Sequence, residues 1–149
     1  MRKLVALSAF LAFAPAALAD ERATTKEAET MVHQAVGFLK KEGPEKALAV
    51  FSDPKGAFTY RDLYVFVLDT TGVMRAHGTK KELVGKNELQ RKDGTGKLFT
   101  REMVELAKAK GSGWVEYKFV NPANGQLENK VAFVERAGDL IVCCGAFVH

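Results

Sequence analysis

The sequence predicts an α+β domain built on one five-stranded antiparallel sheet that is covered on both faces. Apolar residues at helical spacing occur mainly in the first third of the chain and in one short later segment. Segments rich in aromatic and β-branched residues fill most of the rest, and short turns join several of them. Short turns favour antiparallel neighbours. We therefore expect a long N-terminal helix on one face of the sheet and a loop with a short helix on the other.

Three helices are predicted. The first spans residues 24–43, where Thr24 and Glu27 fit a capping box. Pro44 suits the first turn of a second helix over residues 44–53, and residues 100–111 form the third. The apolar stripe of the first helix consists of Met31, Ala35, Phe38 and Leu39.

The five predicted strands cover residues 60–69, 73–78, 112–120, 128–136 and 140–148. The connection over residues 79–100 is polar, contains several glycines and lacks sustained periodicity. Connections of this length in a small domain are often lids or binding loops. We expect this one to close over a ligand.

Residues 1–19 have the pattern of a signal peptide: a basic start, a short apolar run, Pro15 and small residues before Asp20. The apolar run is shorter than the ~20 residues that span a bilayer, so an uncleaved anchor is the less favoured alternative. Residues 20–149 are then a single domain, periplasmic or secreted, that does not insert into the membrane after cleavage.

Charge and cysteine usage limit the partners and cofactors. The formal net charge of +4 includes Arg2 and Lys3, and the basic residues alternate with acids, so nucleic acid is not an expected partner. Cys143 and Cys144 are predicted to be two buried apolar side chains, with a redox switch or an intermolecular disulfide as the alternative. The sequence has no CxxC or cysteine–histidine cluster, so we predict no metal and no cofactor. A homodimer is left open.

Catalysis is not predicted. The sequence has no GxSxG elbow, and the cysteines have no histidine nearby in sequence except the terminal His149. A secreted enzyme is therefore the weakest of three functional hypotheses.

Residues suited to bind a small carboxylate lie on the predicted strands. A period of two places Arg75 and His77 on one face, and Lys130 lies near the start of the fourth strand. Cations would hold the anion and aromatic rings would form an apolar wall. The alternative is that they are ordinary surface charges and core aromatics. The candidate wall residues are Tyr64, Trp114, Tyr117 and Phe133.

Alternation along residues 112–120 also places Trp114 and Tyr117 on opposite faces of their strand. Both rings can line one pocket only if a bulge, at Gly111 or Gly113, or the twist of the strand re-aims one of them. Tyr117 is the less expected direct contact.

The order of motifs along the chain resembles the single Cache domain, type 2. The resemblance rests on FSDPKGAFTYRDLYVFVLDTTGVMRAHG, ELVGKN, KDGTGKLFTREMVELAKAKGSGWVEYKFVNPANG, NKVAFVER and CGAFV. It implies a PAS-like extracytoplasmic sensor fold with a pocket for small organic acids such as acetate, lactate, pyruvate or propionate. The family's site positions fall on His77, Trp114, Tyr117 and Lys130. The chain departs from the family at Phe133, where tyrosine is usual, and at Arg75, where an apolar residue is expected.

These observations predict an exported, non-enzymatic protein that binds a short organic acid. His77 and Lys130 would hold the anion, Tyr117 would donate a hydrogen bond, and Trp114 would form a wall. Signalling would require a separate membrane receptor or kinase. The alternative is a periplasmic assembly module that has kept the fold and lost the pocket.

Overall fold

A computed structural model of the protein describes residues 22–149, and the predicted signal peptide lies outside them. The helices are α1 (Thr25–Glu42), α2 (Pro44–Phe51), the short 3₁₀ helix η1 (Lys81–Leu83) and α3 (Phe99–Lys110). The strands are β1 (Thr59–Tyr60), β2 (Leu63–Asp69), β3 (Met74–His77), β4 (Ser112–Val120), β5 (Leu127–Ala137) and β6 (Leu140–Phe147).

The described residues form one antiparallel sheet in the order β1-β2-β6-β5-β4, with β3 paired to β2. The α+β architecture is confirmed, but the sheet has six strands and not five. The predicted strand over residues 60–69 is divided by a two-residue turn, in which Arg61 has φ 54°. This turn folds the two residues of β1 back onto the start of β2, which produces the extra strand.

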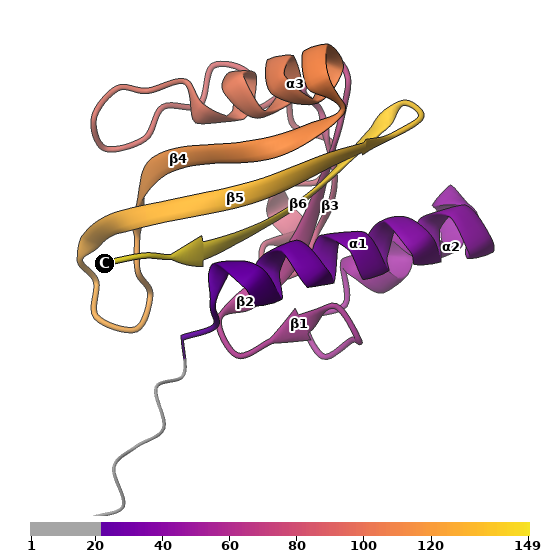
Figure 1. The fold of residues 1–149 in the computed structure, drawn as a ribbon, viewed down its shortest axis with the longest axis horizontal. Helices are drawn as coiled ribbons and strands as arrows, with labels where there is room; N and C mark the ends of the chain where they lie inside the picture. Colours follow the sequence, from indigo (N-terminus) through magenta and orange to yellow (C-terminus); the bar gives the residue numbers. More distant parts are fainter. Residues whose placement is uncertain (1–21) are drawn as a thin grey trace, which may run out of the picture.

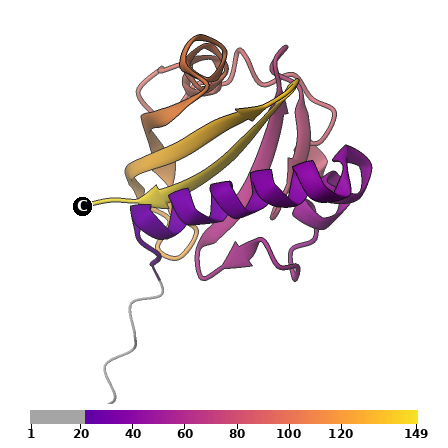
Figure 2. The same cartoon turned by 45° about the vertical axis from the view of Figure 1, so that its right-hand side comes forward.

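The sheet is apolar on both faces, and a different layer covers each one (Figures 1 and 2). On one face α1 packs against Val65, Phe133 and Cys144. On the other, α3 packs through Met103 and Ala107. Because strand side chains alternate, consecutive residues such as Cys143 and Cys144 belong to opposite cores. Both thiols are free and buried, as expected for apolar packing residues.

The ends of the helices agree closely with the sequence signals. Thr24 caps α1, and its capping box with Glu27 is complete. Gly43 ends α1 with φ 83° and ψ 163°, a conformation that only glycine adopts without strain. The long connection is less irregular than predicted, because it contains η1 and a bridge between Val73 and Asn87.

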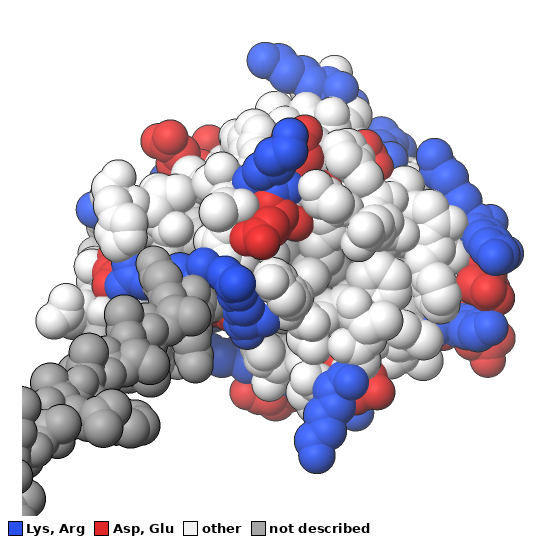
Figure 3. Space-filling view, turned by 60° about the horizontal axis from the view of Figure 1, so that its bottom comes forward, with Lys and Arg blue, Asp and Glu red and all other residues white. Residues whose placement is uncertain are grey.

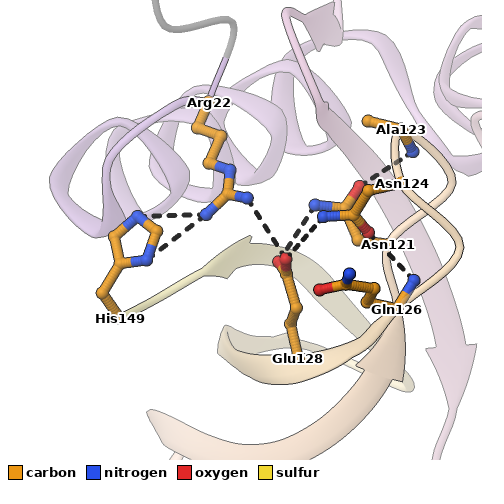
Figure 4. A network of polar contacts seen from close by, with 7 residues as sticks. All are labelled: Arg22, Asn121, Ala123, Asn124, Gln126, Glu128 and His149. Carbon is orange, nitrogen blue, oxygen red and sulfur yellow. Dashed lines mark hydrogen bonds and ion pairs between the residues drawn. The ribbon is translucent and has the colours of Figure 1, made fainter.

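A polar network joins the two ends of the described chain to the β4–β5 turn (Figure 4). The Arg22 guanidinium contacts both the His149 ring, at 3.0 Å, and the Glu128 carboxylate, at 3.2 Å. The side-chain amides of Asn121 and Asn124 donate to the same carboxylate. These hydrogen bonds hold the pKa of Glu128 below its usual value. The turn is therefore fixed to both ends of the domain.

Gly37 inside α1 and Gly43 just after its last residue should respond oppositely to the same substitution. Gly37 is exposed inside the helix with no atom within 4 Å of an added Cβ, so Gly37→Ala should raise the free energy of unfolding by about 0.5–1 kcal/mol. Gly43→Ala should lower it by about 1–3 kcal/mol, because alanine is strained at that φ. Urea unfolding measures both, and equal effects of the two substitutions would contradict the assignment of the helix end.

Candidate ligand-binding site

A cleft of about 490 Å³ opens at one end of the sheet, beside the start of β2 and the end of β4. Two of the predicted residues, Tyr64 and Lys130, line it. The other lining residues are Pro54, Thr59, Tyr60, Arg61, Asp62, Leu63, Thr79, Lys80, Phe119, Val120, Pro122 and Phe147.

The ammonium of Lys130 is surrounded by aromatic rings at the base of this cleft. The Nζ atom lies 4.6 Å from the ring centre of Phe119, 4.7 Å from that of Phe147 and 5.0 Å from that of Tyr64. The β-ladders create this arrangement, because Tyr117, Lys130 and Phe147 are directly opposite one another on three adjacent strands. Aromatic faces attract a cation but do not replace its hydrogen bonds to water.

Lys130 is also short of polar partners. The residue is 3% exposed, and within the described residues its Nζ makes one long hydrogen bond, 3.4 Å to the Tyr64 hydroxyl. None of the ion pairs formed by residues 22–149 involves it. Burial is the main cause that lowers the pKa of Lys130 to about 8; the Lys80 charge acts in the same direction, whereas Cys144 and Asp62 oppose the shift. A buried ammonium with these partners is suited to receive an anion.

His77 lies behind Tyr64, and its neutral ring accepts two backbone hydrogen bonds. Its Nδ1 accepts from the backbone N–H groups of Thr79, at 3.2 Å, and Lys80, at 2.9 Å, so the ring proton is on Nε2. The ring centre lies 4.9 Å from that of Tyr64. Burial, together with the nearby Lys80 and Arg91 charges, lowers the pKa of His77 to about 4. His77 therefore fixes the start of the loop and supports Tyr64, and it does not line the cleft.

Tyr117 is buried beside Lys130 and stacks on Phe99 of α3, with ring centres 4.7 Å apart and planes 4° from parallel. Burial raises the pKa of Tyr117 well above its ordinary value and that of Tyr64 to about 12, so both hydroxyls keep their protons and can donate. The floor beneath Tyr117 and Lys130 is Gly145 of β6. A Cβ there would lie 2.8 Å from Lys130 Cε and 2.9 Å from the Tyr117 hydroxyl.

Three of the predicted site residues lie away from the cleft: Trp114, Phe133 and Arg75. Trp114 and Phe133 are cross-strand neighbours, with ring centres 5.1 Å apart, on the face covered by α1. The Phe133 ring packs against His33 of α1, so Phe133 lies opposite the face that Lys130 occupies. Trp114 is 40% exposed, and it does not pack on Tyr117, because Tyr117 lies on the other face of the sheet.

The expectation that Arg75 and His77 share a face is wrong. The register between β2 and β3 shifts, since Val67 pairs with Ala76 and Leu68 pairs with Met74, which leaves Arg75 as the extra residue of a bulge. Arg75 is exposed and pairs with Asp69 at 3.6 Å. Because a bulge adds one residue to the strand, side-chain alternation cannot assign the faces of residues on its two sides.

The structure adds residues that sequence reasoning missed. Lys80 and Arg91 come from the long loop and lie over the Phe119 ring, at 5.8 Å and 5.9 Å from its centre. Phe119 lies two residues after Tyr117 and Phe147 two after Gly145, so alternation could have placed both on the cleft face. The two loop cations have no periodic signal that could have located them.

On the face shown in Figure 3, basic and acidic side chains are interspersed and separated by uncharged surface. Among the described residues no group of three or more His, Cys, Asp and Glu side chains could hold a metal ion.

Sequence comparison decides the family. The profile of the single Cache domain 2 family matches residues 6–148. The chain belongs to this family. Cache domains of this kind are sensor modules and not a class of enzyme, and they act outside the cytoplasm. No helix within residues 22–149 is long and apolar enough to cross a bilayer.

Solved structures of chemosensory and chemotaxis proteins share the fold. A periplasmic sensor domain of a chemotaxis protein superposes with a TM-score of 0.66 at 26% identity, covering 83% of this chain and 90% of that domain. A Cache chemosensory domain, described in a study of carboxylic acid recognition, has a TM-score of 0.64 at 24% identity, with 83% and 88% covered. A methyl-accepting chemotaxis protein of Vibrio parahaemolyticus RIMD 2210633 reaches 0.69 at 20% identity, with 82% and 86% covered.

One curated relative is the sensor histidine kinase MctS of Rhizobium johnstonii (strain DSM 114642 / LMG 32736 / 3841). It is 35% identical over 74 residues, which are 50% of this chain and 16% of the kinase. The match therefore spans about a sixth of the kinase.

Replacing Lys130 by methionine should stabilise the protein in a pH-dependent way. Because burial lowers the pKa of Lys130 from 10.5 to about 8, the unfolded chain binds its proton more readily than the folded chain between these values. The wild-type fold thus gains stability from this group as the pH rises through that window. The advantage of Lys130→Met in the free energy of unfolding should shrink by about 3 kcal/mol between roughly pH 7 and pH 11.

Urea unfolding across that pH range measures this difference. Lys108→Met, at an exposed position of α3, is the matched control for the loss of one lysine. An advantage of Lys130→Met that does not change with pH would show that the ammonium is well solvated in the folded protein.

Proposed function

We propose that this protein is an exported Cache sensor domain that binds a short organic acid at Lys130. The observation that carries the proposal is the ammonium of Lys130, enclosed by three aromatic rings and without an ion-pair partner among the described residues. Keeping a charge in such a place costs several kcal/mol unless an opposite charge compensates it. A ligand carboxylate would supply that charge.

The cleft offers distinct surfaces for the two ends of such a ligand. The carboxylate would meet Lys130 Nζ and the Tyr64 hydroxyl, which lie 3.4 Å apart at the base. The hydrocarbon end would lie against Phe119, Phe147 and Leu63, which line the same cleft. The solved Cache domain described for carboxylic acid recognition supports this class of ligand for a related fold.

The loop over residues 79–98 is suited to report occupancy to a partner. At its start, His77 holds the backbone of Thr79 and Lys80, and Lys80 lines the cleft. Near its end, the Asp93 carboxylate accepts from the Lys118 backbone N–H at 2.9 Å, which fixes the loop to the edge strand β4. A change at Lys80 on binding would therefore act on a segment with two fixed points. A separate periplasmic receptor or kinase would read it.

The alternative, an assembly module with a closed pocket, has no observation in its favour. It would be supported by Trp114 and Tyr117 packed on each other, whereas they lie on opposite faces of the sheet. The cleft is also open.

Small organic acids should raise the melting temperature of the purified protein. We expect stabilisation by at least one of acetate, propionate, lactate, pyruvate and four-carbon acids, measured by thermal shift and confirmed by calorimetric titration. Lys130→Met should lose at least about 2 kcal/mol of binding free energy, because the acid would lose its charged partner. Lys108→Met should bind like the wild type. No stabilisation by any acid, or undiminished binding by Lys130→Met, would refute the proposal.

Gly145→Ala should close the site while leaving the fold in place. The added methyl group would crowd Lys130 Cε and the Tyr117 hydroxyl, and we expect a loss of about 1–3 kcal/mol in the free energy of unfolding together with loss of acid binding. Gly113→Ala is the matched control, since it adds the same group to β4 against the flexible end of Leu106. Acid binding by Gly145→Ala at wild-type affinity would show that the ligand does not lie over β6.

A further inference from the structure

A second hollow of about 370 Å³ adjoins the cleft. The two share Lys80, Phe119, Val120 and Pro122, so they meet across the Phe119 ring. Lys130 lines the first hollow and Arg91 lines the second. The combined space has room for a ligand longer than one carboxylate and a short alkyl group.

The Phe119 ring lies between two cations that can each receive an anion. Lys130 Nζ is 4.6 Å and Arg91 Cζ is 5.9 Å from its centre, so the two charges lie within roughly 10 Å of each other. Arg91 has a third of its side chain exposed and pairs with Glu88 at 3.4 Å. A guanidinium has five N–H donors in a planar fork, so this pair leaves donors for a second carboxylate.

The charges around the combined hollows favour a doubly negative ligand. The two hollows together are lined by six cationic side chains but by only two acidic ones. The acid nearest Arg91 in sequence, Asp93, already accepts hydrogen bonds from Thr95, Lys97 and Lys118. The cations are Arg61, Lys80, Arg91, Lys92, Lys118 and Lys130, and the acids are Asp62 and Asp93.

Resting on the proposed function, we infer that the ligand is a short dicarboxylate of about four carbons. One carboxylate is held by Lys130 and Tyr64, the hydrocarbon part crosses the Phe119 ring, and the other carboxylate meets the Arg91 guanidinium. A charge-assisted contact at each end spans about 3 Å, which leaves at most roughly 4 Å between the carboxylates. With C–C bonds of about 1.5 Å, an extended four-carbon diacid has that length. Arg91 is then the residue that selects the second acid group.

Succinate and butyrate test this inference, because they have the same number of carbons and differ in one carboxylate. Calorimetric titration of the purified protein should show succinate binding at least ten-fold more tightly than butyrate. Arg91→Gln should remove this preference by weakening succinate binding to the level of butyrate, whereas Lys130→Met should weaken both acids. Arg101→Gln, on α3 and outside both hollows, is the matched control and should keep the preference.

A second variant guards against a structural effect of losing Arg91, which would leave the buried Glu88 without this partner. The double substitution Glu88→Gln and Arg91→Gln removes both charges and should behave like Arg91→Gln. Equal affinities of the wild type for the two acids, or a preference for succinate that survives Arg91→Gln, would overturn the dicarboxylate and leave the carboxylate site at Lys130 standing. Absence of binding by both acids and by the monocarboxylates above would overturn the site itself.

Discussion

The cleft depends on one buried ammonium. Lys130 projects from β5 into a space bounded by the rings of Tyr64, Phe119 and Phe147, which come from three other strands. Aromatic faces lower the cost of the charge but do not solvate it. Each of those rings is placed by the sheet, and the sheet is in turn held between two apolar layers. The fold therefore maintains a charge whose desolvation works against its own stability, a pattern that is common at functional sites.

The two faces of the sheet differ in role, because successive side chains of each strand point to opposite faces. The face under α1 is a continuous apolar core that includes Phe133, and of the residues that line the cleft it contains only Leu63. The opposite face is apolar under α3 and becomes polar only toward the end of the sheet, where Lys130 and the loop cation Lys80 meet. Changes in the loop can thus alter the ligand site without disturbing the core that stabilises the domain.

Much of the fold could be predicted because its signals are local. The capping box at Thr24, the glycine end of α1 and the alternation along β4 each depend on a few neighbouring residues. The opposition of Trp114 and Tyr117 followed from the same alternation and is confirmed, because Trp114 packs on Phe133 of one core whereas Tyr117 belongs to the other. Lys130 and Phe133 are three positions apart on β5, so the same alternation would also have placed them on opposite faces of the sheet.

The predictions that failed, and the site residues that were not predicted, concern features that no periodic pattern in the sequence signals. The bulge that displaces Arg75 depends on the pairing of β3 with β2, and the turn at Arg61 depends on a left-handed backbone at a residue that seldom adopts it. Lys80 and Arg91 reach Phe119 from a loop whose path is set by contacts with distant strands, such as the hydrogen bond from Lys118 to Asp93. The contribution of the loop to the site therefore required the three-dimensional structure.

The bare floor at Gly145 also has an evolutionary consequence. Every glycine codon becomes an alanine codon by one nucleotide change, and Gly145 lies in a strand with an ordinary backbone that alanine can adopt. One mutation could thus fill the space between Lys130 and Tyr117 and leave both apolar cores intact. A lineage that no longer needed its ligand could lose the site in one step and keep the scaffold. The residue at this position would then distinguish sensing from non-sensing descendants of the same domain.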